Sequence, residues 1–194
     1  MSLILWSAIG YLLGSVPFGL VIARALGLGD LRRIGSGNIG ATNVLRTGNK
    51  PAALATLLLD SGKGAIAVLL ARWLAGPEAA MLAGAAAFLG HLYPVWLRFK
   101  GGKGVATFLG TLLALDWRLG LIACALWLAT ALLGRISSLS ALVAAALAPL
   151  AALWLDGSAM AAVTAFMAVL IYFRHRANIA RILDGSEPRI GGKR

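Results

Sequence analysis

The stretch Asp30-Leu-Arg-Arg-Ile-Gly-Ser-Gly-Asn-Ile-Gly-Ala-Thr-Asn-Val-Leu-Arg46 separates two apolar segments, residues 3–28 and 51–74, each long enough to cross a membrane. It is polar, basic and rich in glycine. Glycines expose backbone N–H groups, hydroxyl and amide side chains add neutral donors, and arginines add positive charge. This composition suits a phosphate group, and its position suits a phosphate presented at a membrane surface.

The composition of the whole chain is that of a membrane protein. Its 194 residues are 60% hydrophobic and 13% charged, and the mean hydropathy is +0.85. A soluble domain of this size could not bury so much apolar surface. Basic loops at a membrane explain the net charge of +11, so we expect no nucleic-acid partner. Short loops predict one domain, residues 1–194, and the lone Cys124 excludes a disulfide framework.

The apolar runs predict an all-α fold. Five or six of them are long enough for a helix to cross roughly 30 Å of hydrocarbon. The run at 105–115 is short, so it is either a separate short helix or the first half of one helix that continues through residue 134. The runs are 3–28, 51–74, 79–97, 105–115, 119–134, 139–155 and 159–173.

Charge placement favours seven transmembrane helices with the N-terminus outside and the C-terminus in the cytoplasm. Most of the basic residues then share one side, and only Arg72 and Arg118 lie in loops on the other, as the positive-inside rule demands. A single helix over 105–134 would bury Asp116 and Arg118 in lipid. Seven crossings are therefore predicted, with the glycine-rich loops on the cytoplasmic face.

Two further basic segments fall on the same predicted face, Lys100-Gly-Gly-Lys-Gly104 and Arg174-His-Arg-Ala-Asn178, as does the turn at 135–140. Each segment is either a phosphate-binding site or only a group of basic residues that sets the orientation of the chain in the membrane. Residues 35–40 match G-x-G-x-x-G, but the strand that a dinucleotide fold needs is missing. The segment 100–104 lacks the Ser or Thr that follows the lysine in a nucleotide-binding loop, so no nucleotide is expected.

Four ionisable residues in or beside the apolar runs could carry chemistry. Asp60 and Lys63 are three apart and share a helix face, so they either line a polar substrate cavity or form a neutralised pair that holds helices together. His91 is expected to be a buried structural histidine. His175 lies between two arginines that disfavour its protonated form, which suits a hydrogen-bonding or base role. Two separated histidines and one Cys predict no metal site.

At this point the motifs resemble those of the bacterial integral-membrane glycerol-3-phosphate acyltransferases that use acyl phosphate as donor. The matching stretches occur in the family's order and touch nearly every part of the chain. They are Tyr11–Gly19, Asp30–Arg46, Asp60–Gly64, Gly90–Pro94, Phe99–Thr107 and Arg174–Arg181.

The resemblance implies seven membrane helices, no cofactor, and acylation of the 1-hydroxyl of glycerol-3-phosphate to give 1-acyl-glycerol-3-phosphate in the bacterial inner membrane. It makes membrane lipid a partner and the enzyme that makes acyl phosphate a candidate partner. It assigns catalysis to His175 and Asn178. It assigns substrate binding to Ser36, Gly37, Asn38, Thr42, Asn43, Arg46, Gly102, Lys103, Ser138 and Arg181.

Two other classes fit less well. A small-solute transporter should show internal repeats and matched broken helices, but Gly14 and Pro17 interrupt the first run without a matched partner. A CDP-alcohol phosphotransferase would carry an aspartate-rich D-G-x2-A-R motif, which is missing. Residues alone support a membrane protein that handles a phosphorylated or anionic substrate on its cytoplasmic side.

Overall fold

The computed structural model describes residues 2–191, and all regular structure in that range is helical, as predicted. Between residues 2 and 191, ten α-helices and two 3₁₀ helices follow one another. They are α1 (Leu3–Gly14), α2 (Phe18–Ala25), η1 (Leu31–Arg33), α3 (Ala41–Leu45), α4 (Lys50–Ala75), α5 (Pro77–Leu92), η2 (Val95–Leu97), α6 (Val105–Leu115), α7 (Trp117–Gly134), α8 (Ser137–Asp156), α9 (Ser158–Arg174) and α10 (Arg176–Leu183).

Five segments are long and apolar enough to cross a membrane, and a sixth is available if α9 and α10, bent by 63° at His175, form one broken span. This confirms the expectation of five or six full-length crossings. Helix α6 has 11 residues, which at about 1.5 Å per residue covers only part of the hydrocarbon. The count of seven crossings stays a prediction. The five are Leu3–Ala25, Lys50–Ala75, Pro77–Leu97, Trp117–Gly134 and Ser137–Asp156.

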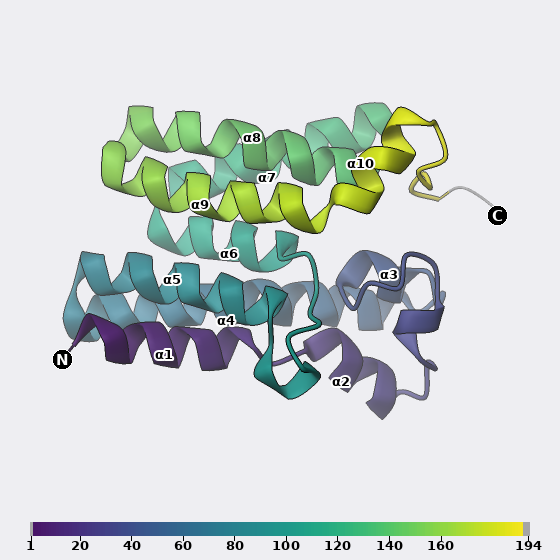
Figure 1. Cartoon of the computed structure of the whole chain (residues 1–194), viewed down its shortest axis with the longest axis horizontal. Helices are drawn as coiled ribbons and strands as arrows, with labels where there is room; N and C mark the ends of the chain where they lie inside the picture. Colours follow the sequence, from purple (N-terminus) through teal and green to yellow (C-terminus); the bar gives the residue numbers. More distant parts are fainter. Residues whose placement is uncertain (1, 192–194) are drawn as a thin grey trace. The chain divides into compact units, whose positions relative to one another are not determined.

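The chain forms two compact units, which divide between Leu115 and Asp116. In the first, α1 packs on α5, and α4 packs on both α5 and α6 (Figure 1). Small residues allow the closest of these contacts. A Cβ at Gly14 would lie 1.9 Å from the carbonyl oxygen of Ala87, and one at Gly10 would lie 2.3 Å from that of Ala83. Such close packing is typical of helices in lipid, where small residues let backbones approach.

The first span is broken between α1 and α2, at Ser15, Val16 and Pro17. The carbonyl of Val16 at the break accepts a hydrogen bond of 2.8 Å from Lys63 Nζ on α4. Lys63 also lies 2.8 Å from Asp60 Oδ1, and both side chains are buried. The predicted pair therefore forms, and it joins α4 to the break in the first span. The short α2 and α3 pack beside α4 at one end of this unit (Figure 1).

The second unit is a packed set of α7, α8 and α9, with α8 in contact with both others and α10 against α8 and α9. Helix α7, the first helix of this unit, begins after an N-cap residue, Asp116. Asp116 is extended (φ −144°, ψ 120°) and accepts a 2.7 Å hydrogen bond from the backbone N–H of Arg118. Hydrogen bonds from Arg118 also hold the pKa of Asp116 below its usual range. The run at 105–115 is thus a separate helix, and the alternative of one helix through residue 134 is excluded.

Candidate functional site

The polar stretch after the first span folds into a short 3₁₀ turn, a glycine loop and α3. Asp30 starts it by accepting a 3.0 Å hydrogen bond from the backbone N–H of Arg32. Gly35 and Gly37 then adopt φ values of 55° and 67°, in the left-handed region that favours glycine. A Cβ at Gly35 would also lie 2.7 Å from the side chains of Asn43 and Arg46. Glycine is therefore required here by conformation and by space.

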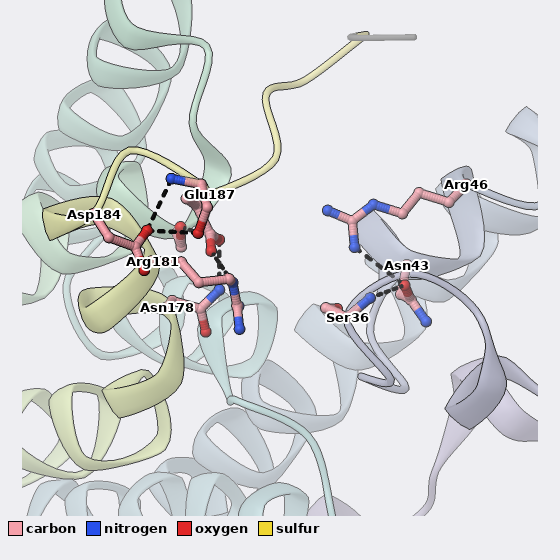
Figure 2. Close-up of polar contacts among 9 residues, drawn as sticks. Ser36, Asn43, Arg46, Asn178, Arg181, Asp184 and Glu187 are labelled. Carbon is pink, nitrogen blue, oxygen red and sulfur yellow. Dashed lines mark hydrogen bonds and ion pairs between the residues drawn. The ribbon is translucent and has the colours of Figure 1, made fainter. Parts of the chain in front are cut away.

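Asn43 is the centre of this loop, and only 1% of it is exposed. Its Nδ2 donates to the carbonyls of Leu31 at 2.8 Å and Asn38 at 2.7 Å. Its Oδ1 accepts from the backbone N–H of Ser36 and from Arg46 Nη1, both at 3.3 Å (Figure 2). One amide side chain thus joins four parts of the loop. These contacts make Asn43 a positioning group for the loop, in contrast to the direct phosphate donor that we expected.

The expectation that glycine N–H groups of this loop stay open to an anion does not hold for Gly37. The N–H of Gly37 donates to the carbonyl of Ile34 at 2.9 Å, and that of Ser36 points to Asn43. The loop closes on itself because a tight turn satisfies its own backbone groups when it can. The predicted contacts of Gly37 and Asn43 with phosphate are therefore not preformed. Ser36 and Thr42 are exposed on the same loop, and Asn38 and Arg46 are half-buried.

The second glycine segment lies beside the first, within the same unit. Arg32 Nη2 donates to the carbonyl of Lys100 at 3.4 Å. The N–H groups of Gly101 and Gly102 donate to the carbonyls of Leu92 and His91, both at 3.1 Å, so the end of α5 supports this loop. Lys103 follows on it and is half-buried. The structure thus brings together the two glycine-rich segments that the sequence predicted as anion sites.

In the second unit, His175 lies at the bend between α9 and α10 and is 3% exposed. Its Nδ1 is 2.8 Å from the carbonyl oxygen of Ile171. A carbonyl only accepts, so this contact assigns the proton of the neutral ring to Nδ1 and the lone pair to Nε2. The ring is therefore held in one orientation and one tautomer.

Three predicted residues of this unit converge on one carboxylate, that of Glu187. Ser138 Oγ donates to Glu187 Oε1 at 2.6 Å, and Asn178 Nδ2 donates to the same oxygen at 2.5 Å. Arg181 Nε donates to Oε2 at 2.7 Å (Figure 2). Asn178 and Arg181 thus lie on one face of α10, and Ser138 joins them from the start of α8. All three donate to a negatively charged group of the chain itself.

Glu187 was not among the residues predicted from the sequence. It lies after the end of α10, where helical spacing from Asn178 no longer applies, and its backbone N–H donates to the carbonyl of Arg181 at 3.0 Å. Its carboxylate is only 6% exposed. Burial alone would raise the pKa of Glu187, but the hydrogen bonds from Ser138, Asn178 and Arg181 outweigh burial and lower it. The one available signal was an acidic residue in a strongly basic C-terminal segment.

The predicted site residues carry guanidinium, ammonium, hydroxyl and amide groups, which are the kinds of donor that bind anions in proteins. Within residues 2–191, no group of three His, Cys, Asp or Glu side chains is placed to hold a metal ion. The fold and the sites define a class: a multi-pass membrane protein that carries polar, basic loops suited to phosphate groups.

Comparison with known proteins narrows that class. A family model described as glycerol-3-phosphate acyltransferase matches residues 4–185, and the chain belongs to this family. A glycerol-3-phosphate acyltransferase of Cereibacter sphaeroides is 72% identical over 192 residues, which cover 99% of this chain and 96% of the relative. One of Ruegeria pomeroyi is 61% identical over 193 residues, covering 100% and 95%.

Two solved structures share the fold. The crystal structure of PlsY (YgiH), an integral membrane glycerol 3-phosphate acyltransferase, in its glycerol 3-phosphate form matches with a TM-score of 0.93 and 40% identity. Its lysophosphatidic acid form matches with a TM-score of 0.90 and 39% identity. Each match covers 98% of this chain and 96% of the PlsY chain.

Proposed function

We propose that this chain is an acyltransferase that moves a fatty acyl group from acyl phosphate to the 1-hydroxyl of glycerol-3-phosphate. The products are 1-acyl-glycerol-3-phosphate (lysophosphatidate) and inorganic phosphate. The observation that carries the proposal is the match over nearly the whole chain to PlsY in forms named for glycerol 3-phosphate and lysophosphatidic acid. The family model spans both compact units, which supports treating residues 1–194 as one acyltransferase domain.

The reaction needs little covalent chemistry from the protein. Acyl phosphate is an activated mixed anhydride, so no acyl-enzyme is required. The hydroxyl oxygen forms an ester bond to the carbonyl carbon, and the bond from that carbon to the phosphate oxygen breaks. The leaving phosphate takes the electron pair and then the hydroxyl proton. The tasks left to the protein are alignment of the substrates and stabilisation of developing negative charge by fixed donors.

The residues of the first unit suit phosphate binding. Arg46 and Lys103 supply positive charge, and Ser36, Asn38 and Thr42 supply neutral donors, on two loops that the Arg32–Lys100 contact links. The geometry supports an indirect role for Asn43, Gly37 and Gly102, whose polar groups hold the loops in shape.

The residues of the second unit suit positioning of a charged substrate. Ser138, Asn178 and Arg181 each donate one hydrogen bond to Glu187. The one hydroxyl hydrogen of Ser138 is used in this way, so direct donation to substrate would come from the other side-chain N–H groups of Asn178 and Arg181. We assign Glu187 to the site as the acceptor that orients all three. His175 and Asn178 stay our candidates for the catalytic residues.

Donor choice tests the proposed function directly. The purified chain in detergent should acylate glycerol-3-phosphate with acyl phosphate and should turn over acyl-CoA and acyl carrier protein far more slowly. The absence of an H-x4-D motif and of a nucleotide-binding loop supports this selectivity. Equal turnover with acyl-CoA would disprove the donor assignment.

Replacement of His175 by Ala distinguishes the two routes for the proton. If the substrate phosphate accepts it, His175→Ala and Asn178→Ala should reduce turnover by comparable factors, since both residues then orient substrate. If Nε2 of His175 is an essential base, His175→Ala alone should lose orders of magnitude, added imidazole should restore activity, and the pH profile should lose one titration.

The orientation of the chain is also part of the proposal, with seven crossings in a bacterial inner membrane, the N-terminus outside and the C-terminus in the cytoplasm. Reporter fusions at Gly76, at Gly157 and after the last residue test it. Both glycines should report the outer side and the C-terminus the cytoplasm. A cytoplasmic signal at Gly157 contradicts the assignment.

A further inference from the structure

Three titratable side chains lie buried in the first unit outside the candidate site. Asp60 and Lys63 on α4 and His91 on α5 are 2%, 4% and 5% exposed. Lys63 pairs with Asp60 and with the carbonyl of Val16, each at 2.8 Å. His91 Nδ1 lies 3.7 Å from the same oxygen of Asp60. Ionisable groups at membrane depth are costly, so a cluster of three is expected to have a role beyond filling space.

The opposite edge of the His91 ring lies against the glycine loop that carries Lys103. A Cβ added at Gly102 would lie 2.1 Å from His91 Nε2 and 3.0 Å from both neighbouring ring carbons. The backbone of His91 also holds this loop, because its carbonyl accepts from the N–H of Gly102 at 3.1 Å. The imidazole therefore lies between the buried ion pair and Gly102, with one nitrogen toward each.

We infer that Asp60 and His91 are positioning residues for the loop at 100–104, and through it for Lys103. Gly101 and Gly102 have no side chains that could pack the loop in place, so the ring beneath Gly102 sets how deeply the loop lies. Asp60 Oδ1 faces Nδ1 of the ring at 3.7 Å, beyond hydrogen-bond distance, so Asp60 acts on the ring through its charge and its packing. Small displacements of a substrate-holding group are costly, about a hundredfold for 1 Å in unfavourable cases.

A second role for the cluster, joining helices only, makes different predictions. Lys63 already joins α4 to the break in the first span through Val16, and that link does not need His91. If the cluster only joins helices, changes to His91 should lower thermal stability and should not change the KM of one substrate relative to the other. If His91 positions the loop, the same changes should affect the one substrate that Lys103 binds.

This inference rests on the proposed function, and the decisive experiment uses the full chain in detergent with Lys103→Ala as the reference. His91→Asn keeps an amide near the Nδ1 position but removes the part of the ring below Gly102. His91→Gln extends an amide toward the Nε2 position. We expect His91→Asn to raise the KM about tenfold for the same substrate whose KM rises in Lys103→Ala. His91→Gln should recover part of this loss.

A double-mutant cycle separates positioning from general damage. His91→Asn combined with Lys103→Ala should have nearly the KM of Lys103→Ala alone, because the ring acts through the lysine. Additive effects of the two changes, or equal rises in KM for both substrates, overturn the inference. Thr111→Val is the matched control, since it removes a buried hydroxyl that faces Gly64 in the same unit and keeps the methyl group that faces Gly84. Its KM values should equal those of the wild type.

Asp60 needs a compensated variant, because Asp60→Asn alone leaves the Lys63 ammonium buried without its carboxylate. The double variant Asp60→Asn with Lys63→Gln is neutral and keeps a donor toward Val16. We expect it to fold and to raise the same KM as His91→Asn. A folded double variant with the KM values of the wild type overturns the role of Asp60.

Hydrogen exchange decides the inference independently of turnover. His91→Asn should speed exchange of the backbone amides at 100–104, while Thr111→Val should not. A wild-type chain without acyltransferase activity would disprove the proposed function, and the exchange result would still stand as a test of the loop. Unchanged exchange at 100–104 in His91→Asn overturns the inference.

Discussion

Two candidate anion sites of this chain are each built around one buried side chain, but the two side chains differ in charge. The loop at 30–46 is organised by the neutral amide of Asn43, which both donates and accepts. The site in the second unit is organised by the carboxylate of Glu187, which only accepts. An amide can close a backbone turn, while a carboxylate can gather several donor side chains at one point.

This difference separates the sites by their dependence on protonation. Asn43 does not titrate, so the first loop should keep its shape over a wide pH range. The second site requires Glu187 to be ionised. A protonated carboxyl carries an O–H group, which is itself a donor and would face the three donor side chains in place of a pure acceptor.

Asn43→Ala should have the strongest effect, about a hundredfold loss of kcat/KM. It removes the donors for the buried carbonyls of Leu31 and Asn38, and each unsatisfied buried group costs about 1–3 kcal/mol. Steady-state kinetics on detergent-solubilised protein measure the loss. Asn49→Ala is the matched control, because Asn49 caps α4 by accepting from the N–H of Ala52. It should lower stability by about 1 kcal/mol and leave kcat/KM unchanged. Wild-type kinetics in Asn43→Ala would show that the loop keeps its active shape without the hydrogen bonds of Asn43.

Glu187→Gln should lower kcat/KM by about tenfold. The amide keeps the shape of the side chain but turns a nitrogen toward one of its donors, and hydrogen bonds to a charged group are worth about 1.5–3 kcal/mol. Asp184→Asn is the control. It changes an exposed carboxylate three positions earlier, which accepts from Ser186. If both variants lose activity equally, the effect comes from the net charge of the C-terminal segment. The role of Glu187 as the acceptor that orients Ser138, Asn178 and Arg181 is then wrong.

Acid should weaken the second site before the first. The pKa of Glu187 is lowered in the folded chain, so its contribution to stability is complete above the unfolded value of about 4.3. That contribution is lost as the pH falls through the lowered folded value. Thermal unfolding of wild type and Glu187→Gln, measured from pH 7 downward, should therefore converge below about pH 4. A gap that stays constant down to the lowest pH would contradict the assignment.

Arg32→Gln should have the smallest effect, less than about threefold on kcat/KM. The hydrogen bond from Arg32 to the carbonyl of Lys100 is long, at 3.4 Å, and exposed. Exposed charged contacts are worth about 0–1 kcal/mol. Arg33→Gln, which removes an exposed pairing with Asp30, is the control and should match it. A tenfold loss in Arg32→Gln alone would make the link between the two glycine loops a main determinant of the first site.

Much of the fold could be predicted because lipid imposes simple rules. The apolar runs located the long helices, and the cost of burying Asp116 and Arg118 correctly placed a break between residues 115 and 117. The spacing of Asp60 and Lys63 correctly gave a pair on one helix face. Each of these inferences depends on local spacing or on burial in hydrocarbon, and both can be deduced from a single sequence.

The internal geometry of the candidate site was harder to predict. The composition of the 30–46 loop indicated hydrogen-bond donors. It could not show that the backbone N–H groups of Gly37 and Ser36 donate to other atoms of the same loop. Glu187 was missed because it lies beyond the end of α10 and its partners lie six, nine and 49 positions away in sequence, outside any regular period. Contacts made by turns and tails depend on the closed backbone path, which periodicity does not reveal.

The link between Lys63 and Val16 has a consequence for biogenesis. A membrane chain is made from its N-terminus, and the first span emerges from the ribosome long before α4. One carbonyl at its break is paired by a side chain that follows 47 residues later. The hydrogen bond at the break in the first span can therefore form only after α4 has been translated and inserted beside it.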